Sequence, residues 1–184
     1  MSIFVVSDLI RRVSEEEILT RFPNRKQQEI TAKSPGDLVS VADTEAENAL
    51  GRELAAYYPS AVIAGEESIA RRPALLQDVT AAEQGFLIDP VDGTNNFING
   101  DERFAMMLTR LRRGVVVAAW IYLPVGGQMA MAECGAGAQL DNRPLHIKAG
   151  PFQPEKMVGA AHINRFPDPL KKIARRNLAR VGKN

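Results

Sequence analysis

The chain has 184 residues, of which 45% are hydrophobic and 24% charged, a composition typical of a globular domain rather than a disordered segment. The 23 Lys and Arg residues nearly balance the 22 Asp and Glu residues, which argues against bulk binding to nucleic acid. No apolar run approaches the roughly 18 residues that span a bilayer, and no secretory signal is recognisable. Since the single Cys134 excludes an internal disulfide, we expect one cytoplasmic domain over residues 1–184 that binds neither nucleic acid nor a membrane.

Two helices are predicted in the first 60 residues. Apolar residues at helical spacing predict a helix over residues 8–22, with Ser7 as its N-cap. A Lys-Ser-Pro-Gly-Asp run at 33–37 predicts a loop. The sequence Thr-Glu-Ala-Glu at 44–47 has the form of a capping box and predicts the start of a second helix, which Pro59 ends.

The next part of the chain is predicted to be mainly β-structure. Residues 69–84 are expected to be irregular or weakly helical. Strands are predicted at residues 62–64, 86–88, 104–111, 115–122, 128–133 and 156–161. The short turns between most of them require antiparallel hairpins. A basic helix with an apolar stripe is predicted at 169–181, so the pattern indicates an α+β fold with a largely antiparallel sheet packed against two N-terminal helices.

Two carboxylates follow the predicted strand at 86–88. Asp89 comes directly after it, and Pro90, which cannot donate to a sheet, is expected to turn the chain away there. Asp92 follows three residues later. Two carboxylates at a strand end favour a shared hard cation such as Mg²⁺, which prefers oxygen ligands. The backbone N–H groups of Gly93 and Thr94 suit a phosphate, and the Thr94 hydroxyl suits a water molecule.

A second acidic segment, Gly-Glu-Glu-Ser at 65–68, follows the predicted strand at 62–64. If that strand lies beside residues 86–88, Glu66 comes next to Asp89. Three crowded carboxylates repel one another unless a cation lies between them. Asp43, taken alone, is predicted to belong to a helix start.

Together these motifs resemble the inositol monophosphatase family of Mg²⁺-dependent, lithium-sensitive sugar-phosphate phosphatases. The most specific is Asp-Pro-Val-Asp-Gly-Thr at 89–94, followed by Asn96 and Phe97. The resemblance covers residues 8 to 180. Its other segments are residues 33–39 with Asp43, residues 65–68, and residues 133–138 with 142–145.

The resemblance implies a role for each matching residue. It implies a layered sugar-phosphatase-like fold, two or three Mg²⁺ ions, and catalysis by Glu66, Asp89 and Thr94. The implied metal ligands are Glu66, Asp89, the Val91 carbonyl and Asp92; the phosphate-binding residues are Asp92, Gly93 and Thr94; the outer shell near a third metal is Asp43, Asp37 and Lys33.

One family feature is absent from this sequence. The family has a Trp-Asp motif in its C-terminal part, whereas the single Trp120 is followed by Ile121, so we expect the C-terminal α/β layer to be truncated. The predicted function is a Mg²⁺-dependent phosphomonoesterase that hydrolyses inositol monophosphate or a related sugar phosphate with a metal-activated water. The alternative is a truncated or degenerate homologue that binds metal, phosphate or a partner chain without efficient catalysis. Predicted partners are the small substrate and a second copy or a complementing C-terminal chain.

Overall fold

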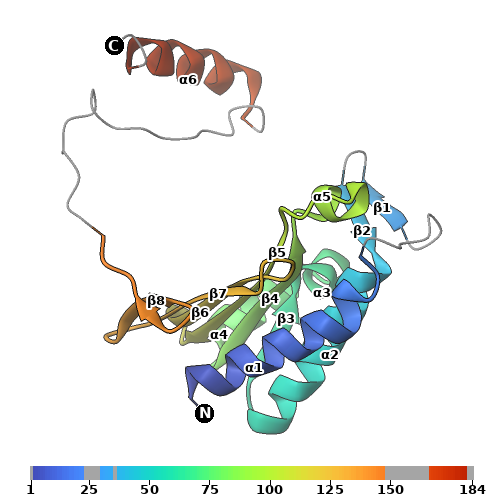
Figure 1. The fold of residues 1–184 in the computed structure, drawn as a ribbon. Helices are drawn as coiled ribbons and strands as arrows, with labels where there is room; N and C mark the ends of the chain where they lie inside the picture. The colour runs from blue at the N-terminus through green and yellow to red at the C-terminus, as the bar shows by residue number, and fades with distance from the viewer. Residues whose placement is uncertain (1, 23–29, 35–36, 148–165, 182–184) are drawn as a thin grey trace. The chain divides into compact units, whose positions relative to one another are not determined.

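The computed structural model describes residues 2–22, 30–34, 37–147 and 166–181 (Figure 1). The chain divides into two compact units, residues 1–145 and residues 146–184, and each is described by itself. The predicted strand at 156–161 lies outside the described residues. The assignment of residues 1–184 to one domain stays a prediction.

The first helix begins earlier than predicted. Helix α1 spans Ile3–Val13 and continues as a short π-helix, η1, over Ser14–Leu19. Ser2, and not Ser7, is the N-cap: the Ser2 side chain accepts a hydrogen bond from the Phe4 N–H at 3.3 Å. Ser7 lies inside the helix and donates back to the Phe4 carbonyl at 2.7 Å, a common arrangement for a serine within a helix.

The segment between the first two long helices is a hairpin rather than the predicted loop. Strands β1 (Ile30–Ser34) and β2 (Asp37–Ser40) pair antiparallel, with Ser34 opposite Asp37. Helix α2 then spans Val41–Tyr57, so it starts three residues before the predicted capping box. Thr44 therefore lies within the helix, and the box does not form its start.

A seven-stranded sheet forms the centre of the first unit, in the order β3-β4-β5-β6-β7-β8-β9. Its strands are β3 (Val62–Gly65), β4 (Gly85–Asp92), β5 (Ala105–Arg112), β6 (Val115–Leu123), β7 (Gln128–Glu133), β8 (Gly137–Leu140) and β9 (Arg143–Pro144). All neighbouring strands pair antiparallel except β3 and β4, which pair parallel. The predicted α+β class with a largely antiparallel sheet is confirmed.

The chain was predicted to leave the sheet at Pro90. Strand β4 instead continues past Pro90 and forms a β-bulge there. Asp89 pairs with Met107 and Asp92 pairs with Ala105, so three residues of β4 span two of β5. A bulge accommodates proline because the residues inside it need not donate to the ladder. Asp89 and Asp92 therefore lie on either side of the bulge.

Two short helices account for most of residues 69–84, which agrees with the weakly helical alternative predicted for this segment. Helix α3 spans Glu66–Arg71 and begins immediately after β3, and helix α4 spans Ala74–Ala81. Helix α4 packs on β3, β4 and β5, where Ala64, Val79 and Leu111 form a small buried cluster.

Helices α1 and α2 cover the other face of the sheet and form the main core with it (Figure 1). Its largest side chains that are removed from solvent include Ile10, Leu50, Phe86 and Trp120. Burying each such side chain stabilises the fold by about 1.5–3 kcal/mol. The Trp120 indole N–H also donates to the Ile3 carbonyl at 3.0 Å, which joins β6 to the first turn of α1.

Beyond α4, the side of the sheet away from α1 and α2 has an apolar row. Met107, Ile121, Ala130 and Leu140 are directly opposite one another on β5, β6, β7 and β8, so their side chains share one face. The Ile121 side chain is 45% exposed, and the other three are partly buried. Asp89, which pairs with Met107, belongs to the same face.

In the second unit, helix α6 spans Asp168–Val181, which confirms the helix predicted at 169–181. Leu170 and Ile173 on its apolar stripe are about half exposed. Among the helices in the described segments, none is long and apolar enough to cross a bilayer.

Trp120→Phe is expected to lower the free energy of unfolding by about 1–3 kcal/mol, because it removes the hydrogen bond to Ile3 and leaves a void beside α1. Urea unfolding followed by circular dichroism measures the loss. Val115→Ala is the control, since Val115 is 63% exposed on the same strand and should change stability by less than about 0.5 kcal/mol. Equal effects of the two substitutions would contradict the structural role of Trp120.

Candidate active site

The structure brings four acidic residues from three segments around the end of β4. Asp89 and Asp92 come from β4, Glu66 is the first residue of α3, and Asp43 lies in the first turn of α2. Burial raises the pKa of Asp89 to about 7, and the charges of Glu66, Asp92 and Asp43 add to the increase. A backbone hydrogen bond from Val91 acts in the opposite direction. Glu66 thus lies near enough to Asp89 for their charges to repel.

The parallel pairing of β3 and β4 explains how Glu66 and Asp89 meet. Gly65 is opposite Ile88, and the next residue of each segment is Glu66 and Asp89 respectively. Because both strands run in the same direction, their carboxyl ends reach the same edge of the sheet. The prediction that the strand before Glu66 lies beside the strand before Asp89 is confirmed.

A buried oxygen of Asp89 is relevant to metal binding. Asp89 Oδ1 is buried and has no hydrogen-bond partner within the described residues. An unpaired carboxylate oxygen among other carboxylates is costly unless a cation or a proton neutralises it. Because all the candidate donors are oxygen atoms, their chemistry suits a hard divalent cation. Across the described ranges, however, no three acidic, His or Cys side chains are arranged as a ready metal site, so the ligand set is partial.

Thr94 begins the short helix α5 (Thr94–Asn99) directly after Gly93. Gly93 has φ of 94°, and a Cβ there would lie 3.1 Å from the Arg103 carbonyl oxygen, so both conformation and space require glycine. Thr94 Oγ1 lies 3.0 Å from the Val91 carbonyl oxygen and 3.4 Å from Asp43 Oδ1, and it can donate its proton to either.

The contact with Asp43 was not predicted. Asp43 is buried, with 1% of its surface exposed, and the sequence suggested only a helix start or an outer-shell position for it. Asp43 does lie in the first turn of α2, and the structure also places it against the Thr94 hydroxyl, across 51 residues of sequence. A motif search within either segment has no signal for such a pairing.

Asp37 and Lys33 lie on the hairpin that precedes α2. Asp37 begins β2 and Lys33 belongs to β1, and β2 lies against α5 (Figure 1). The backbone thus brings β2 to the same end of the sheet as Thr94. The outer-shell roles of both residues stay predictions.

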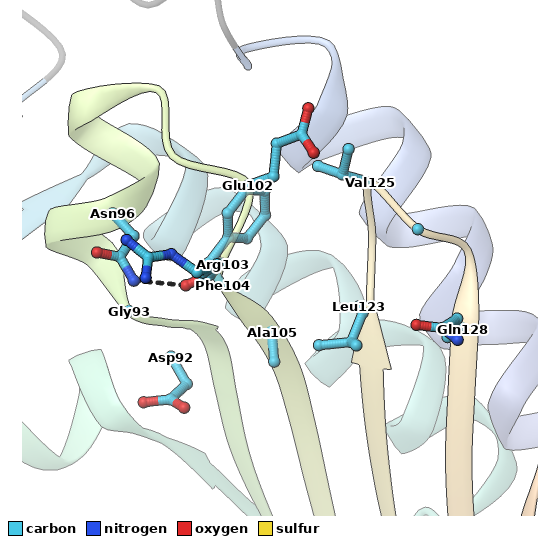
Figure 2. Close-up of a pocket in the computed structure, with 11 residues that line it drawn as sticks. Asp92, Gly93, Asn96, Glu102, Arg103, Phe104, Ala105, Leu123, Val125 and Gln128 are labelled. Carbon is cyan, nitrogen blue, oxygen red and sulfur yellow. Dashed lines mark hydrogen bonds between the residues drawn. The ribbon is translucent and has the colours of Figure 1, made fainter.

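A cavity of about 520 Å³ adjoins the acidic cluster, with Asp92 and Gly93 at its border (Figure 2). Its walls include Phe104 and Leu123, and Asn96 closes one side by donating to the Arg103 carbonyl at 2.6 Å. Its size is that of a site for a small organic molecule. The sequence did not predict it, because its lining comes from β4, α5, β5, β6, β7 and the turns between them.

Arg103 at the cavity is already paired. Its guanidinium forms a two-pronged ion pair with Asp101, with one contact of 2.9 Å from Nε to Asp101 Oδ1. This pairing holds the pKa of Asp101 at about 2. Arg103 therefore contributes an exposed ion pair to the edge of the cavity.

A cluster of carboxylates that includes a buried Asp89 oxygen, beside a small-molecule cavity at the edge of an α+β sheet, defines a candidate site of the metal-assisted phosphatase class. The model of the inositol monophosphatase family matches residues 3–180 of this chain. The chain belongs to the inositol monophosphatase family.

Relatives and solved structures agree with this assignment. An inositol-1-monophosphatase of Rhizobium meliloti is 31% identical over 139 residues, which cover 74% of this chain and 50% of the relative. The Nus factor SuhB of Vibrio cholerae is 31% identical over 157 residues, covering 85% and 55%. The crystal structure of the extragenic suppressor protein suhB from Bartonella henselae superposes with a TM-score of 0.68 at 27% identity, covering 82% of this chain and 56% of that one. The chain thus spans about half the length of the curated relatives it matches.

Asp89→Asn is expected to raise the unfolding temperature of the metal-free protein at pH 8 by at least about 2 °C. Asp89 has a pKa of about 7 in the folded chain, above its ordinary value of 3.8, so the folded state holds this proton more tightly than the unfolded state. The ionisation of Asp89 therefore lowers the free energy of unfolding. This loss of stability is absent below pH 4, grows between pH 4 and pH 7, and reaches its full size above pH 7. Thermal unfolding at pH 4 and pH 8 measures it.

Asp78→Asn is the matched control, because Asp78 lies on the surface in a long ion pair with Arg72, 3.7 Å apart. Its effect should be small at both pH values. A stabilisation by Asp89→Asn that is equal at pH 4 and pH 8 would contradict the charge repulsion at this site.

Proposed function

We propose that this chain provides the metal- and phosphate-binding part of a Mg²⁺-dependent, lithium-sensitive phosphomonoesterase. The substrate is inositol monophosphate or a related sugar phosphate. The observation that supports this most directly is the unpaired buried oxygen of Asp89 among three further carboxylates, in a chain of the inositol monophosphatase family. The name of the Rhizobium meliloti relative supports the substrate class.

The proposed metal ligands are Glu66, Asp89, Asp92 and the Val91 carbonyl, for two or three Mg²⁺ ions. Bound there, Mg²⁺ would lower the pKa of a water molecule and offset negative charge on the phosphate and the leaving oxygen. Asp89 belongs to this set because its buried oxygen lacks a partner in the described part of the chain.

The chain's own groups would orient the reactants. Thr94 Oγ1 donates to Asp43 or to the Val91 carbonyl, which leaves its lone pairs free to accept a hydrogen bond from the attacking water and so orient it. Glu66 would hold the same water from the opposite segment. The N–H groups of Gly93 and Thr94, with the Asp92 side chain, would bind the phosphate. The adjoining cavity of about 520 Å³ would take part of the sugar.

The complete activity is proposed to need more protein than this chain, because the relatives are about twice as long as the matched region. A complementing C-terminal chain or a second copy would supply the rest of the substrate site. The Nus factor relative of Vibrio cholerae is the observation in favour of the alternative, which is binding of metal, phosphate or a partner without efficient turnover. The enzymatic function is better supported, since the family and the name of the Rhizobium meliloti relative both favour a phosphatase. The cytoplasmic location predicted from the sequence remains part of this proposal.

The test is phosphate release from inositol 1-phosphate by the purified chain in Mg²⁺. We expect turnover by the chain alone to be weak, because the rest of the substrate site is missing, but an excess of chelator should abolish it and lithium should inhibit it. Asp89→Asn should lower kcat/KM by about 100-fold or more, whereas Asp78→Asn should leave it within about twofold.

Calorimetry with Mg²⁺ separates the two functions. Metal binding without hydrolysis would support the non-catalytic alternative. If Mg²⁺ does not bind and Asp89→Asn behaves as the wild type, both proposals are wrong.

A further inference from the structure

Glu47 lies in the middle of α2 and is buried, with 7% of its surface exposed. Its carboxylate accepts two backbone hydrogen bonds from a different helix. Oε2 accepts from the Glu67 N–H at 2.8 Å, and Oε1 accepts from the Ser68 N–H at 3.0 Å. These donors belong to the first turn of α3, where backbone N–H groups have no partner within their own helix.

The sequence assigned Glu47 to a capping box on its own helix, and this prediction is wrong. The carboxylate instead does for α3 what an N-cap side chain does, but from another element of the fold. A charged acceptor makes these bonds stronger than neutral ones. Glu47 therefore joins α2 to the first turn of α3.

Gly65 shows how closely the two segments fit. A Cβ at Gly65 would collide with Cδ and Oε2 of Glu47, so the Glu47 carboxylate would have to move from its place beside α3. Since the φ of Gly65 is −120°, space and not backbone conformation requires glycine here. On the other side of the turn, Ser68 Oγ accepts from the Gly65 N–H at 2.9 Å. The Gly-Glu-Glu-Ser segment is thus held at both of its ends.

Glu66 lies between these fixed points. Gly65 before it is packed against Glu47 and is in register with Ile88, and Glu67 after it is hydrogen-bonded to Glu47. The backbone of Glu66 has little room to move relative to Asp89. The Glu66 side chain itself is exposed.

We propose that Glu47 is a positioning residue for Glu66: by holding the first turn of α3, it sets the place of the Glu66 carboxylate relative to Asp89 and thereby the affinity of the site for a divalent cation. This inference rests on the proposed function. Residues that orient metal ligands through hydrogen bonds typically change metal affinity by 10- to 100-fold when they are replaced.

Glu47→Ala is the direct test. A cavity of about 420 Å³ borders Glu47, Gly65 and Ser68, so water can reach the two N–H groups once the carboxylate is removed. We expect amide hydrogen exchange of Glu67 and Ser68 in the metal-free chain to become at least about tenfold faster, with the sheet amides unchanged. The affinity for Mn²⁺, measured by electron paramagnetic resonance, should fall by about 10-fold or more.

Glu47→Gln provides the graded comparison, since the amide offers one acceptor oxygen in place of two. It should recover part of the exchange protection and part of the Mn²⁺ affinity, and it decides the question if Glu47→Ala does not fold. Glu53→Ala is the matched control: Glu53 is on the same helix, in a surface ion pair with Arg12, and its loss should alter neither measurement.

The outcomes separate this inference from the proposed function. Wild-type Mn²⁺ affinity in Glu47→Ala, or faster exchange throughout the sheet, would overturn the positioning role while leaving the proposed function intact. If the wild type binds no Mn²⁺, the proposed function fails, and with it the link from Glu47 to metal affinity. The exchange data would then still decide whether Glu47 holds the first turn of α3.

Discussion

The candidate site depends on one pair of parallel strands in an otherwise antiparallel sheet. Strands β3 and β4 run in the same direction, with Gly65 opposite Ile88, so the residues that follow them emerge at one edge. An antiparallel pairing would have placed Glu66 and Asp89 at opposite ends of the sheet. The long connection through α3 and α4 makes the parallel pairing possible. The repulsion among the carboxylates is a direct result of this topology.

Much of the sheet could be predicted from the sequence because its signals are local. Strands β5, β6 and β7 are short apolar runs separated by tight turns, and a hairpin with such a turn has only one topology. The acidic residues could be identified because they lie in compact motifs at strand ends. Their proximity followed from a single assumption, that the strands before Glu66 and Asp89 are neighbours, and the register of β3 and β4 agrees with it.

The errors arise where tertiary contacts override local patterns. Thr44 to Glu47 has the form of a capping box, yet the Glu47 carboxylate forms stronger bonds with the first turn of α3, 20 residues away. Pro90 signals the end of a strand, but a bulge lets β4 continue to Asp92. The pairing of Asp43 with Thr94 and the lining of the adjoining cavity join distant segments, and no pattern within one segment encodes them.

The apolar row on the open face of the sheet has an electrostatic consequence. Asp89 is directly opposite Met107, and Ile121, Ala130 and Leu140 continue that row across the sheet. Any layer of protein that covers the row also reduces the water around Asp89, which lowers the local dielectric and strengthens the attraction between this carboxylate and a cation. By thermodynamic linkage, a cation bound at Asp89 would favour the covering of the face to the same extent. If Asp89 binds a cation as proposed, covering of this face and ion affinity would be coupled through the solvation of a single side chain.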